Sequence, residues 1–148
     1  MGTLVHKRGS IFASELQGWA HGVNVDGLMG AGLAKTVKLH YPEVYELYRD
    51  ACDDGLNGGD TVVVRANDGT YSFNLASQER PGAHARFSWL RKSAEGAIAF
   101  AEEEGLDGIA FPMIGAGIGG LNPEKVEKLL EELADSTSLT LELWKYPN

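Results

Sequence analysis

A short apolar run that leads directly into a glycine-rich loop and then into a helix start is the feature that most constrains the fold of this chain. The apolar run covers residues 109–114 and the loop covers residues 115–120. Asn122 is suited to cap a helix, Pro123 to its first position and Glu124 to the positive end of its dipole. The stretch predicts a buried strand, a loop with accessible backbone N–H groups, and a helix. Such a unit can hold a phosphate group without a charged side chain.

The loop also satisfies the pattern G-x-G-x-x-G through Gly115, Gly117 and Gly120, which is a weak signal when it stands alone. A dinucleotide-binding fold would carry it near the start of the domain, before a second strand with an acidic residue for the ribose. Here it lies near the C-terminus, and Glu142 falls inside the last predicted strand. A P-loop is excluded because Leu and Asn, not Lys and Ser or Thr, follow Gly120. A flexible glycine connection without a ligand remains the alternative to phosphate binding.

A second glycine-rich loop follows the strand predicted at residues 19–25. Asp26 and Gly27 break that strand, and the loop covers residues 27–32. In open α/β sheets, ligands bind beyond the carboxyl ends of the strands. Two such loops lying side by side would hold an elongated phosphate-bearing ligand between them. The alternative is that both loops are only tight connections.

The remaining hydrophobic patterns give the element order β, β, α, α, β, β, α, β, α, β. An Asp-Gly pair at residues 68–69 predicts a hairpin between two strands rich in β-branched and aromatic residues. The order predicts an α/β domain with a mixed sheet and helices on both sides. The other predicted bounds are strands at 3–8, 61–65, 70–75 and 138–146, and helices at 31–41, 42–52, 87–104 and from 123 onward.

Composition excludes several classes of function. The net charge of −8 argues against general DNA or RNA binding, because proteins of that class present a basic face. The one cysteine, Cys52, rules out an internal disulfide, and its acidic neighbours Asp53 and Asp54 would raise its pKa. No spacing of His, Cys and carboxylates predicts a metal site. We find neither a membrane span nor a signal-peptide pattern and expect a cytoplasmic protein.

The two loops together resemble the macrodomain family. They read VNVDGLMGAGLA at residues 23–34 and FPMIGAGIGGL at residues 111–121, and residues 8–12 resemble the family's opening Gly-Asp-Ile motif. The Met-Gly-x-Gly-Leu-Ala form of the first loop is similar to one branch. That branch contains terminal ADP-ribose glycohydrolases, which unload proteins, and DarG-type antitoxins, which unload DNA. The resemblance covers essentially the whole chain. It implies a single three-layer α/β/α macrodomain over residues 1–148, with a central mixed sheet of about six strands and ADP-ribose in a cleft above it.

The resemblance also implies which residues face the ligand. Ser10 and Ile11 would lie by the adenine, with Ser10 in place of the family's Asp. Tyr146, or Trp144 beside it, would cover the adenine, and a plain core aromatic is the alternative. The distal ribose would meet Asn24, Met29, Gly30, Ala31, Gly32 and Ser77, and the diphosphate would meet Ile114, Gly115, Ala116, Gly117, Ile118, Gly119 and Gly120.

Two groups typical of the branch are absent from this chain. Gln78 replaces a lysine that follows the second hairpin strand, and glutamine has no amine with which to form a Schiff base. Gly119 replaces an Asp that some enzymes of the branch carry in the second loop. The candidate catalytic residues are therefore Asp26 and Gln78, with Asp26 able to position or deprotonate a water molecule. A turn-forming role for Asp26 is the alternative.

His21, in a predicted buried strand, is expected to be a core histidine with its hydrogen bonds satisfied, and His84 and Arg86 are expected to lead into the following helix.

Two functions follow from the resemblance and the candidate site residues. One is a macrodomain hydrolase that releases ADP-ribose from a protein or nucleic-acid adduct with water as nucleophile. The other is a non-catalytic module that binds or sequesters ADP-ribose or a related NAD-derived nucleotide. We expect no cofactor besides this ligand and a monomeric protein. No residue argues in particular for phosphatase action on ADP-ribose 1″-phosphate, which is known in the wider family.

Overall fold

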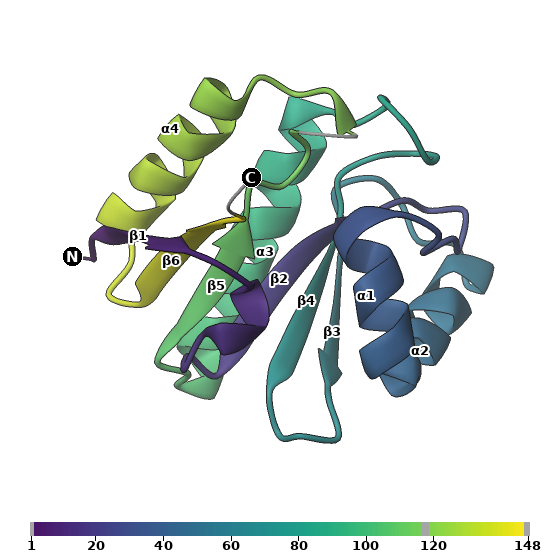
Figure 1. Ribbon diagram of the computed structural model, residues 1–148, viewed down its shortest axis with the longest axis horizontal. Coiled ribbons are helices and arrows are strands. Elements are labelled where there is room, and N and C mark those ends of the chain that lie inside the picture. Colours follow the sequence, from purple (N-terminus) through teal and green to yellow (C-terminus); the bar gives the residue numbers. More distant parts are fainter. Residues whose placement is uncertain (1, 117–118, 147–148) are drawn as a thin grey trace.

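The protein is built on one mixed β-sheet. The computed structural model describes residues 2–116 and 119–146, and among these the sheet has six strands in the order β1-β6-β5-β2-β4-β3 (Figure 1). Neighbouring strands run parallel, except that β3 and β4 are antiparallel. This confirms the predicted mixed sheet. The strands are β1 (Leu4–Arg8), β2 (Gly18–Val23), β3 (Thr61–Arg65), β4 (Tyr71–Ala76), β5 (Gly108–Pro112) and β6 (Thr140–Lys145).

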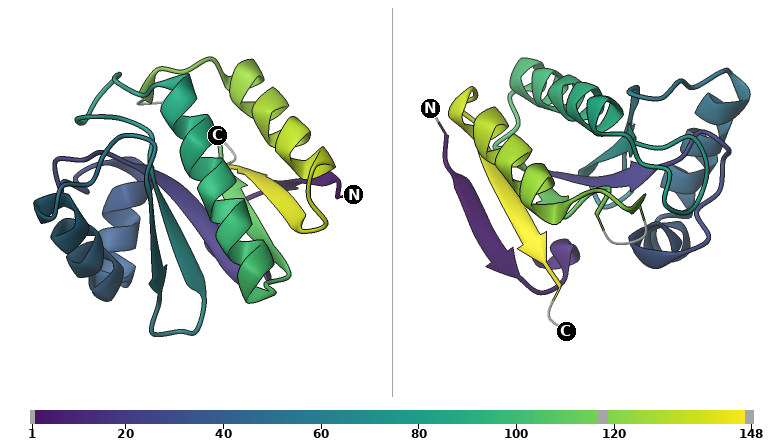
Figure 2. Two further views of the ribbon diagram at one scale, coloured as in Figure 1. Left: turned by 180° about the vertical axis from the view of Figure 1, so that it is seen from behind. Right: turned by 90° about the horizontal axis from the view of Figure 1, so that it is seen from above.

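Helices cover both faces of the sheet, so the molecule has three layers (Figures 1 and 2). One apolar core joins the sheet to α3 and α4, with Phe73, Phe111 and Leu143 among its fully buried side chains. A second core on the other face joins the sheet to η1, α1 and α2. The helices are η1 (Ile11–Ala13), α1 (Gly32–His40), α2 (Pro42–Asp53), α3 (Phe87–Glu104) and α4 (Pro123–Asp135).

The helix signals in the sequence act as expected in α4. The Asn122 side-chain oxygen accepts a hydrogen bond from the Glu124 backbone N–H at 2.9 Å, and Pro123 is the first helical residue. The side chains at the predicted helical spacing are buried against the sheet. Burial of an apolar side chain stabilises the fold by roughly 2 kcal/mol, so this stripe fixes α4 to its face. It consists of Val126, Leu129, Leu130 and Leu133.

The predicted hairpin is confirmed by the antiparallel pairing of β3 with β4. Its turn depends on Asp68 and Gly69. Asp68 Oδ1 accepts hydrogen bonds from the Thr70 backbone N–H at 2.9 Å and the Thr70 hydroxyl at 2.7 Å. Gly69 has φ +90°, a conformation that a residue with a Cβ atom rarely adopts.

Several predicted strand bounds were wrong, and in two of them a local turn takes the backbone N–H groups that would otherwise continue the strand. The strand predicted to reach residue 25 ends at Val23, because the Asn24 side chain draws the next N–H groups into a turn. The strand predicted at 109–114 ends at Pro112, since the Ile114 N–H bonds back to the Pro112 carbonyl at 2.8 Å. The last strand is also shorter than predicted, running from Thr140 to Lys145. No helix in the described part of the chain is long and apolar enough to cross a membrane.

Candidate functional site

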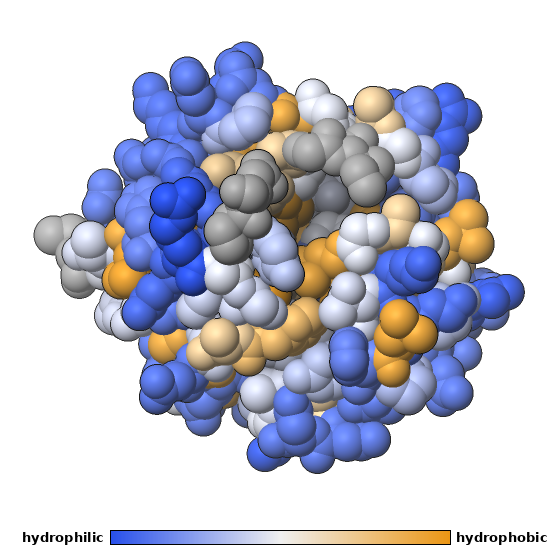
Figure 3. Space-filling model, in the orientation of Figure 1, coloured by the Kyte–Doolittle hydropathy of each residue, from blue (hydrophilic) through white to orange (hydrophobic). Residues whose placement is uncertain are grey.

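Five parallel strands deliver the predicted ligand-facing segments to the same edge of the sheet. Ser10 lies just beyond β1, Asn24 follows β2, Ser77 follows β4, Ile114 lies just beyond β5 and Tyr146 follows β6. Because β2 lies between β5 and β4, the two glycine-rich loops leave neighbouring strands. In the orientation of Figure 1, the molecule is hollowed over this edge, and hydrophobic side chains line part of the hollow (Figure 3). The structure therefore brings the two loops together at a cleft.

The first loop is braced from inside by Asn24. Its side-chain oxygen accepts hydrogen bonds from the backbone N–H groups of Asp26 at 3.0 Å and Leu28 at 3.3 Å. Its side-chain nitrogen donates to the Leu28 carbonyl at 2.8 Å. The buried hydroxyl of Tyr48 donates toward both the carbonyl and the side-chain oxygen of Asn24, at 2.7 and 2.8 Å. The amide of Asn24 is thus largely used to shape the loop, and its predicted contact with the ribose stays a prediction.

The rest of the first loop divides into core and open parts. Met29 is 2% exposed and packs in the core under α1 and α2, which leaves only its backbone for a ligand. Gly30 and Ala31 are exposed, and a Cβ atom added at Gly30 would meet nothing within 4 Å. Gly32 begins α1 with φ +58°, which favours glycine, and the first turn of α1 has no acidic residue. The positive end of this helix is therefore open to an anion.

Two glycines of the second loop, Gly115 and Gly120, are favoured by backbone conformation and by packing within the protein. Gly115 has φ +78°, and a Cβ atom there would lie 2.5 Å from the Leu121 side chain. Gly120 has φ +83°, and a Cβ atom there would lie 3.1 Å from that of Ala83. The side chains of Ile114, which precedes the loop, and Ala116, within it, are buried. The predicted contacts of Gly117 and Ile118 with the diphosphate lie outside the described residues.

Gln78, predicted as a catalytic residue, is held by its own loop. Its side-chain nitrogen donates to the carbonyl oxygens of Arg80 at 2.7 Å and Gly82 at 3.2 Å. Its side-chain oxygen lies 3.3 Å from the position of a Cβ atom on Gly119. Next to it, the Ser77 hydroxyl is 1% exposed and has no hydrogen-bond partner among the described residues. Gln78 is thus engaged in structure, while the role predicted for it in catalysis stays untested.

At the predicted adenine end, Ser10 and Ile11 have local structural roles. The Ser10 hydroxyl oxygen caps η1 by accepting from the Phe12 N–H at 3.3 Å, and Ile11 is 6% exposed in the core. Tyr146 is 77% exposed, whereas Trp144 is half-buried and packs against the core on the α1 and α2 side. The fold therefore holds the Trp144 ring in place, and the predicted contact of either aromatic side chain with the adenine stays a prediction.

The profile of the Macro domain family matches residues 20–130, which include the whole of both glycine-rich loops. The chain belongs to this family. The expected three-layer fold is confirmed by the macrodomain of Thermus aquaticus DarG, which superposes with a TM-score of 0.87 and 26% identity over the whole of both chains. The macrodomain of Mycobacterium tuberculosis DarG superposes with a TM-score of 0.84 and 25% identity, over 100% of this chain and 99% of that one.

Among curated proteins, this macrodomain is similar to two differently named groups. It is 27% identical over 142 residues to the human ADP-ribose glycohydrolase OARD1, covering 95% of this chain and 90% of that protein. It is 25% identical over 143 residues to the DNA ADP-ribosyl glycohydrolase of Thermus aquaticus, covering 94% of this chain and 39% of that protein. The resemblance to the macrodomain branch that holds both kinds of protein is confirmed.

Within the macrodomain, His21 is buried as predicted, but only one of its ring nitrogens is satisfied. Both hydrogens of the Asn74 amide are donated elsewhere, to Val62 and Ser72, so Asn74 Oδ1 accepts from Nε2 of His21 at 2.5 Å. This arrangement requires the tautomer with hydrogen on Nε2, and leaves Nδ1 without a partner among the described residues. Burial lowers the pKa of His21 to about 4, partly offset by the hydrogen bond to Asn74. The ring is therefore neutral at physiological pH.

Two supporting residues were missed by the sequence. Tyr48 is fully buried on α2, and a tyrosine in a helix sequence does not show which partner its buried hydroxyl will have. Glu142 is buried in β6, where one carboxylate oxygen accepts hydrogen bonds from Ser14 Oγ at 2.6 Å and Trp144 Nε1 at 2.8 Å. No sequence signal pairs Ser14 with Glu142, since they meet only across the folded sheet.

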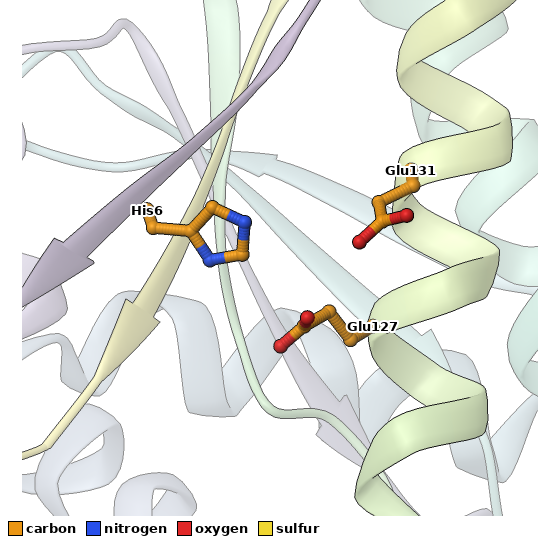
Figure 4. A group of neighbouring side chains, drawn as sticks. All are labelled: His6, Glu127 and Glu131. Atoms are coloured by element: carbon orange, nitrogen blue, oxygen red, sulfur yellow. The ribbon is translucent and has the colours of Figure 1, made fainter.

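A group of potential metal ligands lies apart from the two loops, although the sequence predicted no metal site. His6 on β1 faces Glu127 and Glu131 on α4, and their ligand atoms all lie within 4.8 Å of one another (Figure 4). Lys145 pairs with Glu127 at 2.9 Å, and this salt bridge lowers the pKa of Glu127. An ammonium group therefore already neutralises part of the charge that a cation would use. A cavity of about 510 Å³ beside α4 is lined by both glutamates and Lys145.

Proposed function

We propose that this macrodomain binds ADP-ribose, free or as a terminal adduct, in the cleft over the carboxyl ends of β2, β4 and β5. The observation that carries the proposal is the adjacency of the two glycine-rich loops on neighbouring parallel strands. An elongated ligand with a central diphosphate fits between two such loops, because backbone N–H groups can reach its oxygens from both sides.

The local electrostatics support an anionic ligand despite the net charge of −8. The amino end of α1 lies directly after the first loop, no side chain of the described residues caps it, and its first turn contains no acidic residue. Gly30 leaves open space at this point. Proteins named ADP-ribose glycohydrolase and DNA ADP-ribosyl glycohydrolase are relatives, which supports ADP-ribose as the ligand.

We propose further that any hydrolysis of the ADP-ribosyl bond uses water and not an amine nucleophile. Gln78 has no amine, and its side-chain nitrogen is donated to two carbonyl oxygens. Asp26 is exposed in the first loop, where its carboxylate is the group available to position or deprotonate a water molecule. The adduct would be carried by a protein or a nucleic acid. The alternative is a non-catalytic module that holds ADP-ribose or a related NAD-derived nucleotide.

The remaining expectations belong to the same proposal. We propose that the protein is a monomer, acts in the cytoplasm and needs no cofactor or metal besides its ligand. We also propose that it binds neither membranes nor, in general, nucleic-acid backbones. The acidic composition supports the last point, since it provides few cations to pair with phosphates along a duplex.

Isothermal titration with ADP-ribose tests the binding site. Gly30→Glu places a carboxylate in the open space of the first loop without a steric clash, so it should abolish binding while the protein remains folded. Ala99→Glu, on the exposed surface of α3, adds the same charge away from the cleft and is the matched control. Wild-type protein that does not bind ADP-ribose, or Gly30→Glu protein that binds as tightly as the control, would overturn the proposed site.

Release of ADP-ribose from modified proteins and modified DNA separates the two versions of the function. A water-based hydrolase should release free ADP-ribose, and Asp26→Asn should slow this release at least tenfold, as expected for the loss of a general base. A binding module should bind the same substrates without releasing ADP-ribose. Full activity of Asp26→Asn would remove Asp26 from the mechanism.

A further inference from the structure

The segment of residues 78–86 contacts the second glycine-rich loop and the turn that leads into the first, and we call it the bridging segment. On one side, the Val25 backbone N–H donates to the Glu79 carbonyl at 3.3 Å, which ties the segment to the turn that leads into the first loop. On the other side, the Ala85 backbone N–H donates to the Gly119 carbonyl at 3.2 Å, which ties it to the second loop. The segment therefore links the backbone beside one loop to the backbone of the other, in addition to the pairing of β2 with β5 in the sheet.

Gln78 determines that shape from inside the segment. Its side-chain nitrogen bonds to the carbonyl oxygens of Arg80 and Gly82 and so closes residues 78–82 into a compact turn. Behind the turn, Gln78 and Ala85 form an isolated antiparallel bridge, and the Arg86 N–H donates to the Ser77 carbonyl at 2.8 Å. Both hydrogens of the Gln78 amide are directed at carbonyl groups of the segment that it folds.

The segment packs closely against the second loop at Gly119 and Gly120, where there is no side chain. A Cβ atom on Gly119 would lie 3.0 Å from the Ala85 Cβ and 3.3 Å from the Gln78 side-chain oxygen. A Cβ atom on Gly120 would lie 3.1 Å from the Ala83 Cβ. The bridging segment therefore packs directly against the backbone of the second loop.

We propose that Gln78 is a positioning residue, which folds the bridging segment and thereby holds the two ligand loops at a fixed separation. An amide suits this position because it donates two hydrogen bonds without carrying a charge. The consequence for affinity rests on the proposed binding of ADP-ribose between the loops. The consequence for loop mobility does not, since it concerns the free protein.

Amide hydrogen exchange of the free protein tests the proposal. Gln78→Ala removes both hydrogen bonds, and Gln78→Glu keeps the size but places an oxygen next to the two carbonyl groups. In each variant the amides of Val25 and Ala85 should exchange roughly tenfold faster or more, as the loss of two such bonds predicts. Amides of β4, in the core of the sheet, should exchange as in the wild type, which shows that the fold is intact.

Glu79→Gln is the matched control. It alters the next residue, whose side chain makes one exposed pair, with Arg86 at 3.8 Å, among the residues that the structure describes. It keeps the Glu79 carbonyl that accepts from Val25. Unchanged exchange at Val25 and Ala85 in both Gln78 variants, or equally faster exchange in the control, would overturn the proposal. Titration with ADP-ribose should then show weaker binding by the Gln78 variants than by the control. Failure of the wild type to bind would remove the proposed function but leave the exchange result to decide the role of Gln78.

Discussion

The side-chain oxygen of Gln78 lies 3.3 Å from the point at which Gly119 would carry a Cβ atom. These are the two positions at which the resembled glycohydrolase branch carries a lysine and, in some enzymes, an aspartate. In this chain the pair is an uncharged amide facing a residue without a side chain. The two replacements therefore fit one another, because the amide and Ala85 together fill the space that a side chain at position 119 would need.

This contact predicts that substitutions at the two positions are energetically coupled. Gly119→Asp alone should lower the free energy of unfolding by about 1–3 kcal/mol, because its side chain is forced against Ala85 and Gln78. Adding Gln78→Lys removes the amide oxygen and pairs opposite charges, so the double variant should recover at least about 0.5 kcal/mol of that loss. Urea unfolding of the wild type, both single variants and the double variant measures the coupling. Strictly additive effects would show that the two side chains do not meet.

The same double variant should gain a reaction that the wild type lacks. An amine at position 78 can condense with the aldehyde of ring-opened ADP-ribose, forming a carbon–nitrogen double bond and expelling water. Borohydride then reduces this bond to a stable secondary amine. Mass spectrometry should find the adduct at position 78 in the Gln78→Lys/Gly119→Asp variant. The wild type controls for reaction at surface lysines, and equal labelling of both proteins would contradict the prediction.

Tyr48 should matter to the ligand site although it lies under the loop. Its hydroxyl is the buried donor to Asn24, and burial raises its pKa far above the usual range, so it stays protonated. Tyr48→Phe should lower the free energy of unfolding by about 1–3 kcal/mol, because a buried carbonyl loses its partner. Binding of ADP-ribose should weaken as the first loop loosens.

Tyr45→Phe is the control for this prediction. Its hydroxyl makes only a 3.3 Å bond to the Gly27 carbonyl and receives one from Arg49, on a half-exposed ring. Removing the Tyr45 hydroxyl should lower the free energy of unfolding by less than about 1 kcal/mol. Denaturant unfolding compares the two variants. An equal loss in the free energy of unfolding for both would show that the hydrogen bonds from Tyr48 to Asn24 add no more stability than those of Tyr45.

The sequence predicted those parts of this macrodomain that depend on local signals. The cap at Asn122, the hairpin turn at Asp68 and Gly69, and the order of strands and helices all follow from neighbouring residues. The raised pKa of Cys52 was predicted from its acidic neighbours, but burial is the larger cause. The rule for open α/β sheets placed the two loops beyond the carboxyl ends of their strands, and the resemblance implied one cleft for both.

The sequence did not predict contacts that arise only when the sheet forms. Tyr48 meets Asn24 because α2 folds back over β2, and Gln78 meets Gly119 because the segment after β4 crosses to the loop after β5. His6 meets Glu127 and Glu131 only when β1 and α4 pack together. Residue types gave no indication of these partners, since each side chain has an ordinary surface or core role in its own element.

The buried His21 predicts a specific dependence of stability on pH. In the folded state burial holds its pKa at about 4, while the unfolded chain has the ordinary value of 6.5. Between these values the unfolded state binds a proton that the folded state does not, so stability falls as pH decreases from 6.5 toward 4. Below pH 4, where the histidine is protonated in both states, this difference in pKa lowers the free energy of unfolding by about 3 kcal/mol in total.

Denaturant unfolding between pH 4 and 7 tests this origin of the acid sensitivity. His21→Gln keeps an amide N–H for Asn74 but cannot be protonated, so its stability should fall less steeply with decreasing pH than that of the wild type. The difference in slope should approach one proton, since carboxylates titrate alike in both proteins. His40→Gln, at the exposed end of α1, removes a histidine without touching the core and should follow the wild-type curve. If His21→Gln and the wild type lose stability in parallel, the acid sensitivity must arise from groups other than His21.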